Sequence, residues 1–186
     1  MPKKMNRFQE DLFRRTGGDV SFLSFLKEFF VPQYKVVFLK RLCEYFYENI
    51  RFLYPVVYFI YRQFKIRYGC DIPAKVLIGK GLKIGHIGGI VINPNVKIGN
   101  NVDILNGVLI GESYRGKKKG CPVIGNNVWI GTNVAIVGNI TIGDDVLIAP
   151  NTLVSESVPS HSLVCGNPMS IYPRENATYA FIINKV

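Results

Sequence analysis

A single histidine in a glycine-rich segment is the strongest chemical feature of the sequence. His86 lies in IGHIGGIVI, residues 84–92, and is one of only two histidines in the chain. A neutral imidazole can take a proton from a hydroxyl group near pH 7, and glycines on both sides leave room for a ligand. His86 is therefore a candidate general base. The other histidine, His161, lies in VPSHS, where we expect a terminal turn.

A basic segment is the second feature that could do chemistry. Residues 112–122 read ESYRGKKKGCP, with three consecutive lysines and Arg115 among glycines. Such a segment is either a solvated loop or a flexible flap that closes over a phosphorylated ligand. Cys121 has no neighbouring base in the sequence, so we expect it to line a pocket and not to act as a nucleophile.

Both features interrupt a repeat of six residues. Aliphatic residues recur at positions 72, 78, 84 and 90, then, after a two-residue slip, at 98, 104 and 110, and after the basic segment at 124, 130, 136, 142, 148 and 154. A strict period of six fits a triangular coil with three short strands in 18 residues and Gly, Asn or Asp at its corners. The repeat predicts stacked coils around a column of Ile and Val. It does not by itself separate an enzyme from a structural scaffold.

Composition places the chain among ordinary folded proteins. Of its 186 residues, 48% are hydrophobic and 19% are charged, which is enough apolar material for a core. The four cysteines form no CxxC pair, so a reducing compartment is the default. The first twenty residues lack a signal-peptide pattern, and no apolar run is long enough to span a membrane. We therefore expect the protein to be located in the cytoplasm.

The character of the chain changes near Gly69. Apolar residues before it follow a helical rhythm that predicts two or three helices, so we expect a helical segment at 1–68, a β-helix domain at 69–172 and a tail at 173–186. Residues 1–67 contain thirteen Lys and Arg against six Asp and Glu. No nucleic-acid-binding motif accompanies this excess. The basic, aromatic helices either pack together and cap the coils or lie on the inner face of the membrane.

Residues 71–168 resemble the bacterial serine acetyltransferases, including the shorter enzymes of capsule and exopolysaccharide biosynthesis. The resemblance rests on DIPAKVLIGKGLKIGHIGGIVI, GNNVWIGTNVAIVGN and VPSHSLVCGNP. It implies a mainly β protein with a left-handed parallel β-helix, assembled as a homotrimer with active sites between subunits. It also implies acetyl-CoA as donor and no metal. Carbonic-anhydrase-type β-helices need three zinc-binding histidines, and this chain has two.

The resemblance also implies roles for single residues. His86 matches the catalytic histidine of the motif H-x-x-G-I-V-I, and Asp71 matches the carboxylate that orients it. Stacking by 18 residues would place Asp71 beside position 89. The acceptor would contact Gly85, Asn106 and Cys121. Acetyl-CoA would contact the following residues: Gly111, Gly131, Thr132, Gly138, Ala149, Pro150, Lys118 and Arg174.

The sequence departs from the family at positions that would bind the acceptor. Gly85 stands where the family has an acidic residue, and Gly120 and Cys121 stand where it has an Arg-His pair. The carboxylate of an amino acid needs a cation and its ammonium needs an acid. Our main prediction is therefore acetyl transfer to a hydroxyl of a free or lipid-linked sugar or polysaccharide precursor. The alternatives are a serine O-acetyltransferase of cysteine biosynthesis and a non-catalytic β-helix scaffold.

Overall fold

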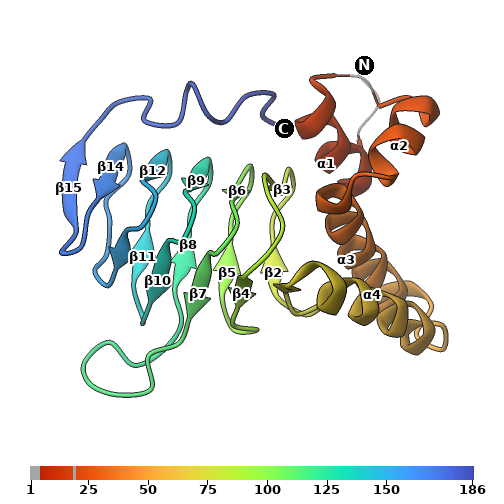
Figure 1. Cartoon of the computed structure of the whole chain (residues 1–186), viewed down its shortest axis with the longest axis horizontal. Helices are drawn as coiled ribbons and strands as arrows, with labels where there is room; N and C mark the ends of the chain where they lie inside the picture. The colour runs from red at the N-terminus through yellow and green to blue at the C-terminus, as the bar shows by residue number, and fades with distance from the viewer. Residues whose placement is uncertain (1–4, 19) are drawn as a thin grey trace.

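The computed structural model describes residues 5–18 and 20–186, in which helices are followed by coils of short strands (Figure 1). The helices are α1 (Arg7–Thr16), α2 (Phe22–Phe29), α3 (Pro32–Asn49) and α4 (Tyr54–Tyr68). The expectation of two or three helices was wrong. Apolar periodicity missed α1 because its buried face carries Asp11 and Arg14 beside Leu12.

The strands form three sheets. Sheet A contains β1 (Cys70–Asp71), β4 (Ile90–Ile92), β7 (Leu109–Gly111), β10 (Ala135–Val137) and β13 (Leu153–Val154). Sheet B contains β2 (Leu77–Ile78), β5 (Lys97–Ile98), β8 (Val123–Ile124) and β11 (Thr141–Ile142). Sheet C contains β3 (Lys83–Ile84), β6 (Asp103–Ile104), β9 (Val128–Ile130), β12 (Val146–Ile148), β14 (Ser162–Cys165) and β15 (Ser170–Pro173).

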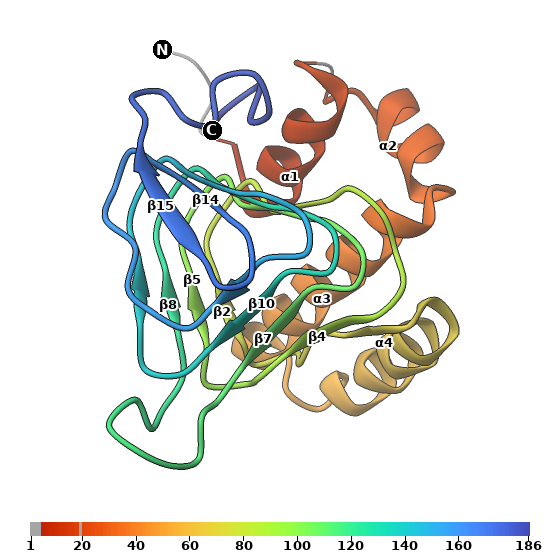
Figure 2. The same ribbon diagram turned by 60° about the vertical axis from the view of Figure 1, so that its left-hand side comes forward.

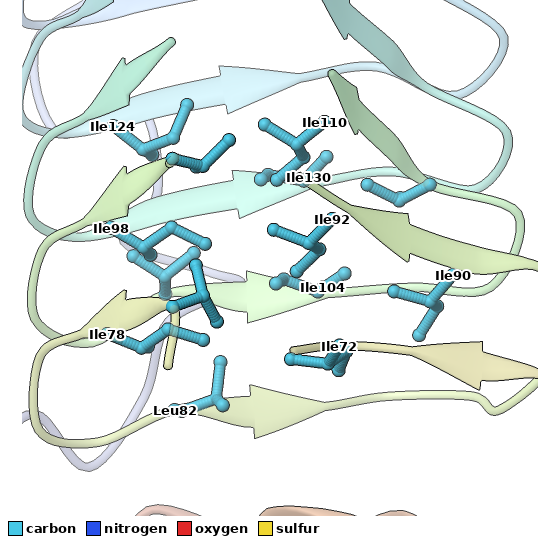
Figure 3. Close-up of a cluster of buried hydrophobic side chains, with 14 of the residues drawn as sticks. Ile72, Ile78, Leu82, Ile90, Ile92, Ile98, Ile104, Ile110, Ile124 and Ile130 are labelled. Carbon is cyan, nitrogen blue, oxygen red and sulfur yellow. The ribbon is translucent and has the colours of Figure 1, made fainter. Parts of the chain in front are cut away.

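Neighbouring coils pair in parallel, whereas the last two strands, β14 and β15, pair antiparallel. The predicted β-helix is confirmed, and its hexapeptide repeats fit the left-handed form. The repeated aliphatic residues point inward and stack on their counterparts in the next coil (Figure 3). Ile78, Ile98 and Ile124 form one such buried column.

The edge between sheets B and C shows why the corners need small or amide residues. A Cβ atom on Gly99 would lie 2.5 Å from the Gly125 carbonyl oxygen of the next coil. The following Asn100 accepts a hydrogen bond from the backbone N–H of Lys80 (3.0 Å) and donates its own backbone N–H to Asn126 (2.9 Å). Asn101, at one of the corners where the repeat predicts Gly, Asn or Asp, has a positive φ, which Asn tolerates better than most residues.

Two insertions change the register between coils. Asp71 pairs with Val91, so this coil has 20 residues (91 minus 71) and the expected pairing with position 89 was wrong. The extra residues form the corner that contains Gly88 and Gly89, both with positive φ. The second insertion is the basic segment between β7 and β8, which projects from the coils (Figure 2). Both insertions leave the buried columns intact.

The helices close the open end of the first coil. Lys40 donates to the Val76 carbonyl (3.0 Å), and Arg41 donates to the Ile78 carbonyl (2.9 Å). The Tyr61 hydroxyl donates to the Ile72 carbonyl (2.7 Å). Arg41 is itself neutralised by Asp11 at 2.7 Å. These contacts satisfy carbonyl groups that would otherwise be buried without a partner.

The C-terminal residues 174–186 return along sheet C to the helices, and we call this segment the strap (Figure 1). Asp145 accepts hydrogen bonds from the backbone N–H groups of Ala177 and Thr178, each at 3.0 Å, and pairs with His161 Nδ1 at 3.0 Å. Farther along, Val186 exchanges two hydrogen bonds with the Asn101 side chain. The strap therefore ties the last coils to the first.

Charge strengthens the anchor of the strap. Burial opposes ionisation of Asp145, but hydrogen bonds from Thr178, His161 and Ala177 lower its pKa. The hydrogen bond to Asp145, with help from Glu175, raises the pKa of His161. The ionised Asp145 carboxylate therefore stabilises the anchor fully at pH values above the usual pKa of an aspartate. This stabilisation is lost as the pH falls through the lowered pKa of Asp145. The stabilisation from protonated His161 is complete at pH values below the usual pKa of a histidine. It is lost as the pH rises through the raised pKa of His161.

We predict that Asp145→Ala lowers the free energy of unfolding by about 2–3 kcal/mol, because several buried donors lose their acceptor. Protease cleavage within residues 174–186 should become faster, as measured by mass spectrometry. Asp144→Ala is the matched control, since Asp144 bonds to Asn126 of the neighbouring coil and not to the strap. Equal cleavage in the two variants would contradict the assigned anchor.

Candidate active site

His86 lies at the edge where the chain passes from sheet C to sheet A, which we call the C–A edge. Backbone hydrogen bonds align this edge from coil to coil: Gly85 N–H to Ile104 (2.9 Å), Leu105 N–H to Ile130 (3.1 Å) and Gly131 N–H to Ile148 (3.0 Å). The residues that follow these donors are His86, Asn106 and Thr132, and Pro150 follows Ala149 in the next coil. Four predicted site residues thus lie in line along one edge.

The C–A edge combines polar side chains with an open corner. The Thr132 hydroxyl donates to Asn106 Oδ1 at 3.1 Å. His86 is exposed, and its imidazole has no hydrogen bond or ion pair among the described residues. A Cβ atom on Gly88 would meet nothing within 4 Å, so the corner beside His86 has space for a ligand. The imidazole is therefore free to act on a bound hydroxyl group.

Asp71 does not pair with His86 within one chain. Its carboxylate forms an ion pair with Lys65 at 2.6 Å, and its side chain is 67% exposed. Asp71 pairs in register with Val91, beyond the glycine corner that follows His86. The role of Asp71 in orienting His86 stays a prediction.

A groove beside Asp71 contains cations that the sequence analysis did not single out. It has a volume of about 490 Å³ and lies between α4 and sheet A, lined by Tyr58, Arg62, Lys65, Asp71 and Val91 among others. Arg62 and Lys65 are three positions apart and therefore share one side of α4. Their approach to β1 depends on how α4 packs on the first coil, so local sequence could not reveal it.

The basic segment forms a hairpin, which we call the flap, at the edge between sheets A and B. Ser113 and Gly120 pair at its base. Lys118 accepts a backbone hydrogen bond from Asn139 (2.9 Å) and donates its Nζ to the Ser155 carbonyl (2.7 Å). The Gly138 N–H donates to Gly111 (3.2 Å). Gly111, Lys118 and Gly138 therefore lie together, but on the opposite edge of sheet A from His86.

Two predicted residues have particular surroundings. Cys121 lies at the base of the flap, directly after Gly120, with its thiol 3.4 Å from Asn93 Oδ1. Burial, helped by the charge of Glu112, raises the pKa of this thiol. Arg174 lies apart from the other expected acetyl-CoA contacts, at the edge between sheets B and C, where its N–H donates to the His161 carbonyl (2.7 Å). No cluster of three His, Cys, Asp or Glu side chains able to hold a metal occurs in residues 5–18 and 20–186.

Comparison with known proteins gives one family and a set of similar structures. Residues 121–156 match the bacterial transferase hexapeptide family (six repeats). The serine O-acetyltransferase of Brucella melitensis is 26% identical with a TM-score of 0.73, covering 91% of this chain and 67% of its own. The chain is therefore similar to the serine acetyltransferases, and its residues 121–156 carry the hexapeptide repeat of bacterial transferases. No curated protein sequence matches it.

Two further similar structures carry ligands. The Neisseria gonorrhoeae serine acetyltransferase in complex with serine is 29% identical with a TM-score of 0.72, covering 89% of this chain and 67% of its own. The Brucella abortus enzyme in complex with coenzyme A is 25% identical with a TM-score of 0.73, covering 91% and 66%. The chain thus spans about two thirds of their length. The coenzyme A complex agrees with the expected acetyl-CoA donor.

The raised pKa of Cys121 gives a prediction about the reactivity of its thiol. Its thiol should react with iodoacetamide more slowly at pH 7.5 than a free cysteine, because less of it is thiolate. Cys121→Ser should keep the rate of acyl transfer within about threefold, since direct transfer needs no covalent cysteine intermediate. Mass spectrometry and a coenzyme A release assay measure the two effects. A trapped acyl-Cys121 would contradict direct transfer.

Proposed function

We propose that the chain transfers an acetyl group from acetyl-CoA to a hydroxyl group, with His86 as general base. The observation that carries this proposal is the alignment of His86, Asn106, Thr132 and Pro150 along the C–A edge. A long extended donor could follow this edge because backbone groups and small residues recur there in every coil. His86 lies at the end of the line, beside the open glycine corner.

The chemistry requires a base at that end. A hydroxyl group is a poor nucleophile at pH 7, so His86 removes its proton as the oxygen attacks the thioester carbonyl. The carbon–sulfur bond then breaks, and the thiolate of coenzyme A takes up a proton. General-base assistance of this kind is worth about 10²–10⁴ in rate. Asp71 would hold the imidazole in the required tautomer once its carboxylate is within reach.

L-Serine is the first candidate acceptor. The comparisons favour it over the sugar hydroxyl of our main sequence prediction, because the similar structures are serine acetyltransferases and one contains serine. The groove beside Asp71 supports the same choice. Arg62 and Lys65 could supply the cation that an amino-acid carboxylate needs, although Gly120 and Cys121 replace the family's Arg-His pair.

A sugar hydroxyl, free or lipid-linked, is the second candidate. Gly85 supplies no carboxylate for the ammonium group of serine, and the corner next to it is open. A neutral acceptor would not need that charge. Its recognition would depend on hydrogen bonds from groups such as the Asn106 amide.

We further propose a homotrimer whose active sites lie between copies. Within one chain the C–A edge and the flap are separated by the width of sheet A, so a second copy could bring the flap of one chain to the His86 of another. The outward residues of sheet A support a contact of this kind. Val91, Leu109 and Leu153 are apolar, partly exposed and aligned through their strand pairing.

The function is tested by coenzyme A release from acetyl-CoA with L-serine, free sugars and nucleotide sugars in turn. We predict that His86→Ala lowers kcat by about 10²–10⁴ and leaves the KM of acetyl-CoA nearly unchanged. His161→Ala is the matched control, because His161 belongs to the strap anchor. The fastest acceptor identifies the substrate class. The scaffold alternative would be favoured if His86→Ala left coenzyme A release unchanged, or if no acceptor gave any release.

The trimer is tested by light scattering on Leu109→Arg. A charge in the middle of the apolar column should lower the measured mass from about three chains to about one and reduce acetyl transfer with it. Tyr179→Arg, on the exposed strap, should change neither quantity. A wild-type chain that is monomeric and active would contradict the proposal.

A further inference from the structure

The outer face of α4 is apolar and uncovered. Helix α4 packs Val57 and Tyr61 against the core, yet its opposite side carries Val56, Phe59 and Ile66, each at least 60% exposed. Phe52, just before the helix, is 79% exposed. A helix that is apolar on both sides is normally covered on both sides. Isolated exposed apolar residues need no explanation, but several large ones on one side of a single helix point to a binding surface.

The charge around these side chains has one sign. Residues 50–69 contain four cations, Arg51, Arg62, Lys65 and Arg67, and no Asp or Glu. Lys65 pairs with Asp71, whereas Arg62 and Arg67 have no carboxylate partner among the described residues. Cations that flank an apolar helical face are typical of surfaces that bind anionic lipid, since the apolar side chains enter the interface and the cations meet the headgroups.

Helix α2 contributes further exposed apolar side chains at this end of the molecule. Its Phe22 and Leu23, and Phe30 directly after it, are more than 70% exposed. The Lys35 ammonium lies 5.8 Å from the Phe30 ring and 5.4 Å from the Phe64 ring of α4, so it joins the two helices. Figure 2 shows both helices on the side away from the flap and the strap.

We propose that the outer face of α4, with Phe52, docks on the surface of an anionic lipid bilayer. None of the helices in residues 5–18 and 20–186 is long and apolar enough to cross a membrane, so the helix would lie in the plane of the interface. A second copy is a poorer occupant. A self-complementary contact would bring the cations of two copies together without any carboxylate on this segment to neutralise them.

Vesicle flotation tests the proposal with the full chain and two vesicle types, phosphatidylcholine alone and an equal mixture with phosphatidylglycerol. The chain should float with the anionic vesicles at low salt and be released at high salt, because salt screens the headgroup charge. The double variant Arg51→Gln with Arg67→Gln should weaken partitioning of the chain onto the anionic vesicles about 25-fold. Each lost cation accounts for about fivefold of this factor. Phe52→Ser with Phe59→Ser should abolish flotation.

The controls remove the same chemical groups elsewhere. Tyr179→Ser and Lys185→Gln change an exposed aromatic ring and an exposed cation of the strap, and both should float like the wild type. Acetyl transfer to a water-soluble acceptor should be the same in all variants, because membrane docking is independent of the proposed function. Failure of the wild type to float would overturn the proposal. A phenylalanine variant that floats normally but has a smaller mass in light scattering would assign the face to a second copy instead.

Discussion

Backbone hydrogen bonding between coils is the constraint on which the rest of the structure depends. The strands from β1 to β14 pair in parallel with their counterparts in neighbouring coils, and the buried aliphatic residues stack in the same register. A shift of one residue would turn these columns outward. Insertions are therefore tolerated only at the edges, where both the His86 corner and the flap occur. The same rigidity gives the edges regular spacing, which suits the recognition of an extended ligand.

The open end of the first coil imposes a second requirement. Its carbonyl groups need donors, and α3 and α4 supply them through Lys40, Arg41 and Tyr61. Burial of Arg41 at the open end of the first coil requires a counterion, which Asp11 supplies. Because Asp11 belongs to α1, this helix also helps to cap the coils. The inner faces of the helices are thus committed to capping the coils. The outer face of α4 has no such task, although it carries the exposed apolar side chains of Val56, Phe59 and Ile66.

The sequence predicted the coils well because their period is strict and local. Ile98 and Ile104 occupy the inward positions that the six-residue spacing assigns to them, and Asn101 has the turn conformation expected of a corner. Three features escaped prediction. The pairing of Asp71 depends on the length of the glycine corner, helix α1 is held by charged contacts and not by an apolar stripe, and Arg62 reaches the groove only through the packing of α4. The first depends on two extra residues within one corner, and the other two are set by contacts between segments far apart in the chain.

The acetyl-transfer site that we propose at His86 and the C–A edge can be tested by a crystal structure of the chain with coenzyme A bound. We expect the pantetheine arm to lie along the edge past Thr132 and Asn106, with the thiol within reach of the His86 imidazole. Coenzyme A bound at the edge between sheets B and C, or with its thiol away from His86, would contradict this proposal.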